Sequence, residues 1–159
     1  MFRTILLCTV MLFAAAGPVM ADESAVFDRK MAAARQGNPE AQYDVAYRYE
    51  KGRGVDEDED AALAWYRKAA DQDLAKAQYK LGMCYLKGKG TDPDRQQARA
   101  WLRKAAEQGY PPAQYHLGKL YTTRPGRNYR MALEWLEKAQ DAGYEPATRA
   151  ISKVRRKLN

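Results

Sequence analysis

The chain has 159 residues, with 27 Lys and Arg against 20 Asp and Glu, so its formal net charge is +7. This length corresponds to one domain, and a content of 30% charged residues excludes a polytopic membrane protein. Eleven Tyr and three Trp argue against a disordered chain, because large side chains bury surface that offsets the entropy cost of ordering. We therefore expect a compact, basic, folded protein.

The first 21 residues have the pattern of a secretory signal peptide. Arg3 precedes an apolar stretch from Ile5 to Ala16, and Val19 and Ala21 supply small side chains at the cleavage site. An uncleaved membrane anchor is the alternative, but about a dozen apolar residues fall short of the roughly 20 that span a bilayer. We expect cleavage after Ala21, a periplasmic or secreted location, and no transmembrane segment in the remaining chain.

The rest of the chain is an internal repeat. The tripeptide Ala-Gln-Tyr occurs at 41–43, 77–79 and 113–115, in steps of 36 residues. Trp65 and Trp101 are also 36 residues apart, whereas Trp135 follows after 34 because two residues are missing from the third loop. A fixed period of this length is typical of a solenoid of stacked helical units.

The pattern of each unit predicts a pair of helices. In the first helix, apolar residues recur at helical spacing, and Gly82 and Gly118 mark a position that needs a small residue where two helices touch. Paired glycines end this helix. The second helix begins at a residue type that favours the N-cap, namely Asp58, Asp94 or Asn128.

Partial units flank the three full ones and supply caps. The predicted segments are a capping helix at 22–37, repeats at about 38–73, 74–109 and 110–143, and a C-terminal capping helix at 145–158. In the last of these, Ser152 stands at the small-residue packing position. The expected fold is all-α, a right-handed superhelix of about eight helices.

The repeated pattern Ala-Gln-Tyr-x-Leu-Gly-x-x-Tyr-x-x-Gly-x-Gly, followed by Asp, Trp, Lys-Ala-Ala and Gly, resembles the Sel-1-like repeat family, a relative of the tetratricopeptide repeats. The resemblance covers nearly all of residues 30–158. It departs from the pattern at Ala46, Asp73 and Gln140 and in the short third loop. The resemblance implies a binding scaffold that assembles complexes, often in the bacterial periplasm or envelope, and implies no catalytic site.

The residues themselves also give little sign of catalysis. His116 is the only imidazole, and no nucleophile, base and orienting group can be assembled around it. Cys84 occupies a position that is apolar in other units, which predicts a buried, inert thiol. The acidic run 56–60 reads as the capped start of a helix, with a cation site as the alternative. We expect no cofactor or metal, and a hydrolase stays a remote alternative.

The first functional prediction is a partner-binding site on the concave face of the superhelix. Two rows of positions on the first helices point away from the paired helix, and by analogy with tetratricopeptide repeats they line a groove for a protein or peptide segment. The rows consist of Tyr43, Tyr79, Tyr115 and Arg149, and of Tyr47, Met83, Lys119 and Lys153. The alternative for the Tyr positions is a structural role between adjacent helices.

The second prediction concerns charge. Residues 22–90 hold 12 basic and 13 acidic side chains, whereas residues 91–159 hold 14 and 7. The surplus forms a predicted basic patch of Arg124, Arg127, Arg130, Arg155, Arg156 and Lys157. An anionic envelope polymer, a lipid surface or an acidic protein fits this patch. The signal peptide argues against a nucleic-acid partner, and a solvated end cap is the alternative.

Overall fold

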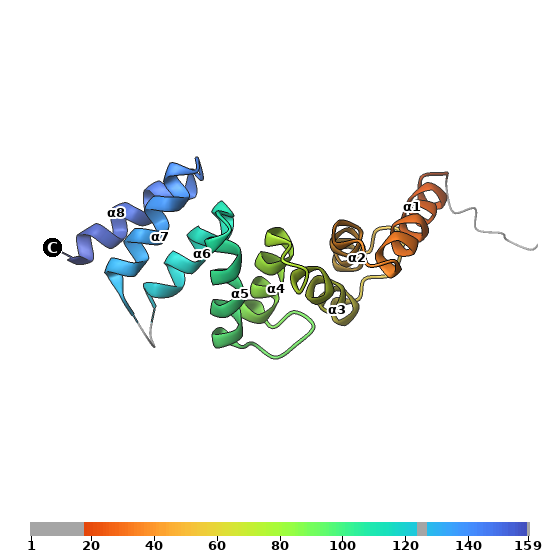
Figure 1. Ribbon diagram of the computed structural model, residues 1–159, viewed down its shortest axis with the longest axis horizontal. Coiled ribbons are helices and arrows are strands. Elements are labelled where there is room, and N and C mark those ends of the chain that lie inside the picture. Colours follow the sequence, from red (N-terminus) through yellow and green to blue (C-terminus); the bar gives the residue numbers. More distant parts are fainter. Residues whose placement is uncertain (1–17, 124–126, 159) are drawn as a thin grey trace, which may run out of the picture.

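The computed structural model describes residues 18–123 and 127–158, and the regular structure in these residues consists of eight α-helices (Figure 1). They are α1 (Pro18–Arg35), α2 (Pro39–Lys51), α3 (Glu59–Ala70), α4 (Ala75–Lys87), α5 (Arg95–Glu107), α6 (Pro111–Tyr121), α7 (Tyr129–Asp141) and α8 (Pro146–Leu158). The helices follow one another along the molecule, and each packs on the next. The predicted all-α solenoid is confirmed.

The helix starts predicted from local chemistry are confirmed. Asp58 Oδ1 accepts a hydrogen bond from the backbone N–H of Ala61 at 2.8 Å, and Asn128 Oδ1 accepts one from Met131 at 3.0 Å. Asp94 caps α5 in the same way. Each side chain satisfies a backbone donor that the first turn of a helix leaves free, so these three residues fix where α3, α7 and α5 begin.

A residue in the left-handed conformation follows the second helix of each pair, two or three positions after its last residue. Gly109 and Gly143 have φ of 81° and 79°, and Asp73 has φ of 60° at the equivalent position. Asp73 is the only residue other than glycine with positive φ in the described part of the chain. Its Oδ1 accepts a hydrogen bond from Gln78 Nε2 at 3.2 Å, which offsets part of the cost of about 1 kcal/mol for this conformation.

Small residues lie where the two helices of a pair cross. A Cβ atom on Gly82 would lie 2.8 Å from Cγ of Leu102, and one on Gly118 would lie 2.8 Å from Cγ of Leu136. Ala46 is fully buried at the equivalent position of the first pair. The prediction that this position requires a small residue is therefore confirmed.

The same prediction is wrong for the last helix. Ser152 stands at the position of Gly82 and Gly118 but is exposed, and its hydroxyl donates to the carbonyl of Thr148 at 3.2 Å. None of the residues that the structure describes covers the side of α8 on which Ser152 lies. The residue keeps the register of the repeat without its packing role.

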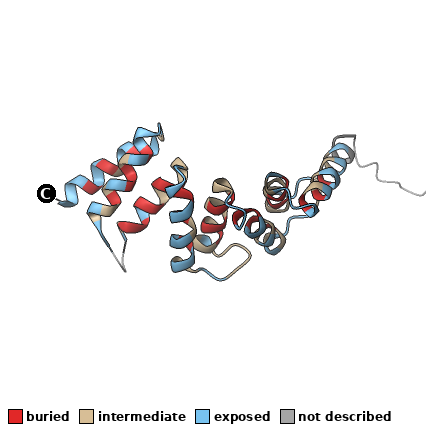
Figure 2. Cartoon of the chain, viewed as in Figure 1, coloured by how far each residue is buried: buried red, intermediate tan, exposed pale blue. Residues whose placement is uncertain are grey.

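The core runs between neighbouring helices through the whole length (Figure 2). The residue after each repeated Trp is completely buried. These residues are Tyr66, Leu102 and Leu136. The Trp rings themselves lie nearer the surface in two units, and a Lys three residues later lies over each ring at 4.0–4.2 Å. Leu102 and Leu136 lie against Gly82 and Gly118 of their own pairs, so the apolar core forms within each pair as well as between successive pairs.

Buried glutamines connect the units. The amide nitrogens of Gln42, Gln78 and Gln114 each donate to a backbone carbonyl of the preceding helix at 3.2–3.3 Å. Gln72 donates in turn to Gln42 Oε1, and Gln108 to Gln78 Oε1, both at 2.8 Å. We call this chain of bonds the glutamine ladder. It satisfies side-chain amides that would be costly to bury alone.

The ladder is incomplete in the third unit. Gln114 Oε1 is buried and has no hydrogen-bond partner among the described residues. The donor position of the ladder is occupied there by Ala142, which has no side-chain amide. Ala142 and Gln108 both follow the last residue of their helix with nearly the same backbone angles. The missing bond therefore results from the side chain and not from the backbone.

Candidate functional site

The predicted Tyr row lies between the first helices of successive units. Tyr43, Tyr79 and Tyr115 are half-buried. Tyr79 packs against the ring of Tyr110 at 5.4 Å, and Tyr115 against that of Tyr144 at 5.3 Å. Burial raises the pKa of Tyr43 and Tyr79 to about 12. These contacts give the row a structural role, and a direct binding role for it stays a prediction.

His116 extends this aromatic packing. Its ring lies 5.7 Å from that of Tyr79 and 5.2 Å from that of Tyr115. Burial lowers the pKa of His116 to about 4, with further contributions from Lys119 and Lys87. The imidazole is therefore neutral at physiological pH and serves as an aromatic spacer between α4 and α6.

The second predicted row begins in a surface whose charges are already paired. Tyr47 lies between Arg53 and Lys80, each 5.5 Å from its ring. Lys80 Nζ lies 2.9 Å from Glu50 Oε2, which also accepts a hydrogen bond from the Tyr66 hydroxyl at 2.6 Å. Burial alone would raise the pKa of Glu50, but these hydrogen bonds outweigh it and lower the pKa to about 2.

Glu50 and Lys80 also line a small cavity of about 100 Å³, which we call the first inter-repeat site. It is lined by Glu50, Tyr79, Lys80, Met83, Cys84, Lys87 and Lys89. Cys84 is 7% exposed, and burial raises the pKa of its thiol to about 11. The prediction of a buried thiol is confirmed, and at neutral pH the sulfur carries its proton, which makes it a poor nucleophile.

The acidic run stands at the start of α3. Asp58 caps the helix, and Glu59 pairs with Lys89 at 2.9 Å. In residues 18–123 and 127–158, no three His, Cys, Asp or Glu side chains form a group that could hold a metal ion. Helix capping and an ion pair between units therefore account for two of the acids.

None of the described helices is long and apolar enough to span a membrane.

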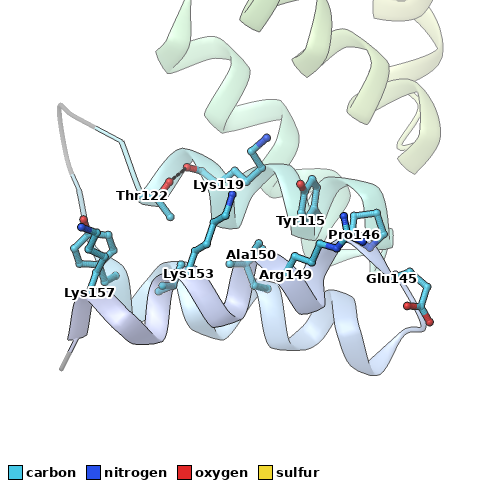
Figure 3. A pocket seen from close by; sticks show the side chains of 12 residues that line it. Tyr115, Lys119, Thr122, Glu145, Pro146, Arg149, Ala150, Lys153 and Lys157 are labelled. Atoms are coloured by element: carbon cyan, nitrogen blue, oxygen red, sulfur yellow. Dashed lines mark hydrogen bonds between the residues drawn. The ribbon is translucent and has the colours of Figure 1, made fainter.

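The C-terminal members of both predicted rows come together in an open groove of about 730 Å³, which we call the C-terminal groove. Figure 3 shows Lys119 on α6 and Arg149 and Lys153 on α8, with Lys157 towards one end and Glu145 at the other. The groove is also lined by Tyr115, Thr122, Tyr129, Leu136, Pro146, Ala150 and Val154. The structure thus joins the concave rows to one member of the basic patch.

The cations of this groove are not held in ion pairs. Lys119, Arg149, Lys153 and Lys157 form no ion pair with any residue that the structure describes. Glu145 is the one acid in the lining, and it lies at the end of the groove nearest Arg149 and opposite Lys157, without forming an ion pair. The groove is therefore strongly positive, in contrast to the paired charges around Tyr47.

The two sites are equivalent in the register of the repeat. Glu50 corresponds to Thr122, 72 residues later, and Lys80 corresponds to Ala150, 70 residues later because of the short third loop. Met83, Cys84 and Lys87 correspond in the same way to Lys153, Val154 and Lys157. Beneath them, Tyr66 corresponds to Leu136. The hydrogen-bonded side chains of Glu50, Lys80 and Tyr66 are thus replaced by the smaller ones of Thr122, Ala150 and Leu136. These replacements open the C-terminal groove.

The remaining members of the predicted basic patch are dispersed. Arg155 lies 2.8 Å from Glu137 of α7, in the place where two earlier units pair a Tyr hydroxyl with an Arg. Arg127 lies over the ring of Tyr129 at 5.3 Å. Arg130 and Arg156 are exposed outside the groove lining, and Arg124 lies outside the described residues. The patch is therefore not one surface.

Sequence reasoning missed the floor of the groove. Thr122, Tyr129, Ala150 and Leu136 were not predicted as site residues, because none of them carries a charge or repeats as a motif. The spacing of Arg149, Lys153 and Lys157 at i, i+4 and i+8 was the available signal, since it places three cations on one side of a helix.

Comparison with known proteins agrees with this architecture. The Sel1 repeat model matches residues 39–74, 75–110 and 111–144. A solved Sel1 repeat protein from Oxalobacter formigenes is 38% identical, with a TM-score of 0.76 over 82% of this chain and 53% of its own. The antigen c5321, a protective antigen of uropathogenic Escherichia coli strains with an SLR fold, is 26% identical, with a TM-score of 0.82 over 86% of this chain and 30% of its own.

This chain thus covers about half the length of the Oxalobacter formigenes protein and about 30% of the length of c5321. Among curated proteins, none matches it. The three matched repeats cover most of the chain and coincide with the helix pairs α2–α3, α4–α5 and α6–α7. The chain belongs to the Sel1 repeat family.

Proposed function

We propose that this protein is a non-enzymatic interaction scaffold of the bacterial periplasm or envelope that binds a segment of a partner protein along the first helices of its repeats. The observation that carries the proposal is the C-terminal groove. It combines an apolar floor with four unpaired cations, the mixture of contacts through which protein surfaces anchor partners.

The side chains that could support catalysis are engaged elsewhere. The Cys84 thiol is buried and protonated, and the His116 imidazole is held between two Tyr rings. Ser152 is exposed and bonded to its own helix. These placements support a scaffold over a hydrolase, since a nucleophile needs a base within hydrogen-bond reach.

Two double variants test which part of the face binds. Immobilised protein carrying Arg149→Gln and Lys153→Gln should recover less of a native envelope partner than the wild type. The pair Tyr47→Ala and Met83→Ala tests the N-terminal part of the same face. Circular dichroism establishes that each variant is folded. Full recovery of the partner by both folded variants would overturn the proposal.

The proposed location rests on the signal peptide. Residues after Ala21 contribute contacts that dock α1 on α2: Glu23 pairs with Arg48 at 2.6 Å, and Phe27 packs edge-on against Tyr49 at 5.3 Å. A chain that begins at Asp22 therefore keeps this packing. N-terminal sequencing of the protein from a periplasmic fraction should start at Asp22. Full-length protein confined to the cytoplasm would contradict the proposed location.

A second candidate function is a basic module on an anionic envelope polymer or lipid surface. The exposed Arg130 and Arg156 and the charge surplus of the C-terminal half favour it. Binding of this kind falls steeply with salt, because exposed charges are screened within about 10 Å at 0.1 M salt. It should disappear when Arg155, Arg156 and Lys157 become Gln, and binding that is insensitive to salt would exclude it.

A further inference from the structure

We propose that the C-terminal groove binds an extended acidic segment of a partner protein, in which carboxylate side chains alternate with apolar ones. This inference rests on the proposed scaffold function and names the class of segment that the groove takes. It follows from the equivalence of the two inter-repeat sites, from the spacing of the cations and from the apolar floor.

The first inter-repeat site shows how one unit places a carboxylate at a position that is Leu86 in the next unit and Thr122 in the third. There the chain supplies its own carboxylate: Glu50 lies between Lys80 at 2.9 Å and Lys51 at 3.2 Å, and the Tyr66 hydroxyl donates to it. In the C-terminal groove, Thr122 stands in place of Glu50. Lys80 is replaced there by Ala150, and the groove takes its cations from neighbouring positions of the repeat, namely Lys119, Arg149, Lys153 and Lys157. The groove therefore gathers cations without the internal carboxylate, and the carboxylates of a partner neutralise them.

The spacing of the cations fits an extended chain. Arg149, Lys153 and Lys157 are four residues apart on α8, which places successive side chains about 6 Å apart along the helix. Alternate residues of an extended strand are about 6.6 Å apart and point the same way. Three carboxylates at alternate positions of a segment therefore meet the three cations of α8 in register.

The floor of the groove fits the intervening residues. Tyr115, Tyr129 and Ala150 are half-buried, so each leaves apolar surface open, and Leu136 and Val154 close the floor beneath them. An extended segment turns every second side chain to its opposite face. A segment with acids on one face and apolar side chains on the other satisfies both the cations and the floor.

This combination favours a protein segment over the other anionic partners. A bilayer surface presents headgroups to a convex or flat protein face, whereas this site is a groove between α6 and α8 that is lined by apolar residues as well as cations (Figure 3). A polyanionic polymer pairs with cations but offers no apolar side chains to cover Tyr115 and Tyr129. Among the cations of the described patch, Arg130 and Arg156 lack this floor.

Fluorescence anisotropy with a labelled, amidated peptide Glu-Leu-Glu-Leu-Glu tests the inference on the intact protein. We expect binding tighter than about 1 mM, with at least tenfold weaker binding of Gln-Leu-Gln-Leu-Gln. The double variant Arg149→Gln with Lys153→Gln should weaken binding of the acidic peptide about tenfold. Its matched control, Arg130→Gln with Arg156→Gln, removes the same charge from exposed positions outside the groove and should change binding less than threefold.

A further variant fills the groove from within. Thr122→Glu restores the carboxylate of the first inter-repeat site, and it should compete with the peptide and weaken binding about tenfold while helicity is unchanged. Equal losses in the groove variant and its matched control would overturn the inference in favour of a diffuse anionic surface. Phosphatidylglycerol vesicles that bind in place of the peptide would also overturn it.

The outcome for the scaffold function is separate. If the acidic peptide fails to bind while the variants at Arg149 and Lys153 still lose a native protein partner, the inference about the segment is wrong and the scaffold function stands. If the acidic peptide does not bind and the variants at Arg149 and Lys153 still recover the native partner, the groove is not the binding site.

Discussion

The incomplete glutamine ladder predicts a stabilising substitution. Ala142→Gln places an amide donor next to the buried Gln114 Oε1, in the geometry that Gln108 has with Gln78 at 2.8 Å. The backbone at Ala142 already matches that at Gln108, with φ of −81° against −76°, so the new side chain needs no rearrangement of the chain.

The magnitude follows from the state of the acceptor. A hydrogen bond between neutral groups contributes a net of about 1 kcal/mol, and a buried acceptor without a partner costs about 1–3 kcal/mol. Because the new side chain also loses rotamer freedom, we expect Ala142→Gln to raise the free energy of unfolding by about 1 kcal/mol. The reverse change, Gln108→Ala, should lower it by about 1–2 kcal/mol by leaving Gln78 Oε1 without its donor.

Urea denaturation followed by helical circular dichroism measures both changes. A gain of about 1 kcal/mol moves the midpoint upward by about 0.5 M urea at an unchanged slope. Gln140→Ala is a control, because Gln140 is exposed and bonds only to the Thr148 hydroxyl in the described structure. An unchanged midpoint in both Ala142→Gln and Gln108→Ala would refute the reasoning that the ladder stabilises the stacking of units.

Three further predictions concern packing and pH. Gly118→Val should lower the free energy of unfolding by about 1–3 kcal/mol, because even its Cβ would lie 2.8 Å from Leu136 Cγ and 3.0 Å from the Ala132 carbonyl; thermal denaturation checks this. His116, whose pKa is about 4 when folded against 6.5 unfolded, binds a proton more readily in the unfolded chain, so stability falls as pH drops from 6.5 to 4. His116→Asn should flatten urea midpoints over that window. Glu50, whose pKa is about 2 when folded against 4.5 unfolded, contributes stability that is present above pH 4.5 and lost towards pH 2. Glu50→Gln should therefore be less stable than the wild type at pH 7 and nearly equal to it at pH 2.

The repeat and its helix boundaries could be predicted because they depend on local chemistry. A period of 36 residues is visible without structural information, and Asp58, Asp94 and Asn128 cap helices through atoms two or three residues away. The crossing position of Gly82 was predictable for a related reason. Glycine inside a helix costs about 1 kcal/mol, so its recurrence indicates that a larger side chain would not fit.

The groove could not be predicted in the same way, because it depends on which units touch. Thr122, Ala150 and Leu136 are ordinary residues in the sequence. They open a groove because they lie together at the positions that are equivalent, in the register of the repeat, to those of Glu50, Lys80 and Tyr66. Recognising this requires the contact between α6 and α8 and that between α7 and α8.

The basic patch shows a further limit of sequence reasoning. Counting charges located the surplus in the C-terminal half but could not separate Arg155, which pairs with Glu137, from Lys153 and Lys157, which line the groove. The Tyr row shows the same limit, because a residue that repeats in every unit has the same pattern whether it packs or binds.

Photo-crosslinking in the native host's envelope, followed by mass spectrometry, tests the central claim most directly. A photoreactive residue in place of Lys153, in the C-terminal groove, should capture a discrete protein through an acidic segment. The same residue in place of Glu134, which is exposed on α7 outside the groove lining, should not. Equal capture at both positions, or capture of only lipid or polymer at position 153, would contradict the account.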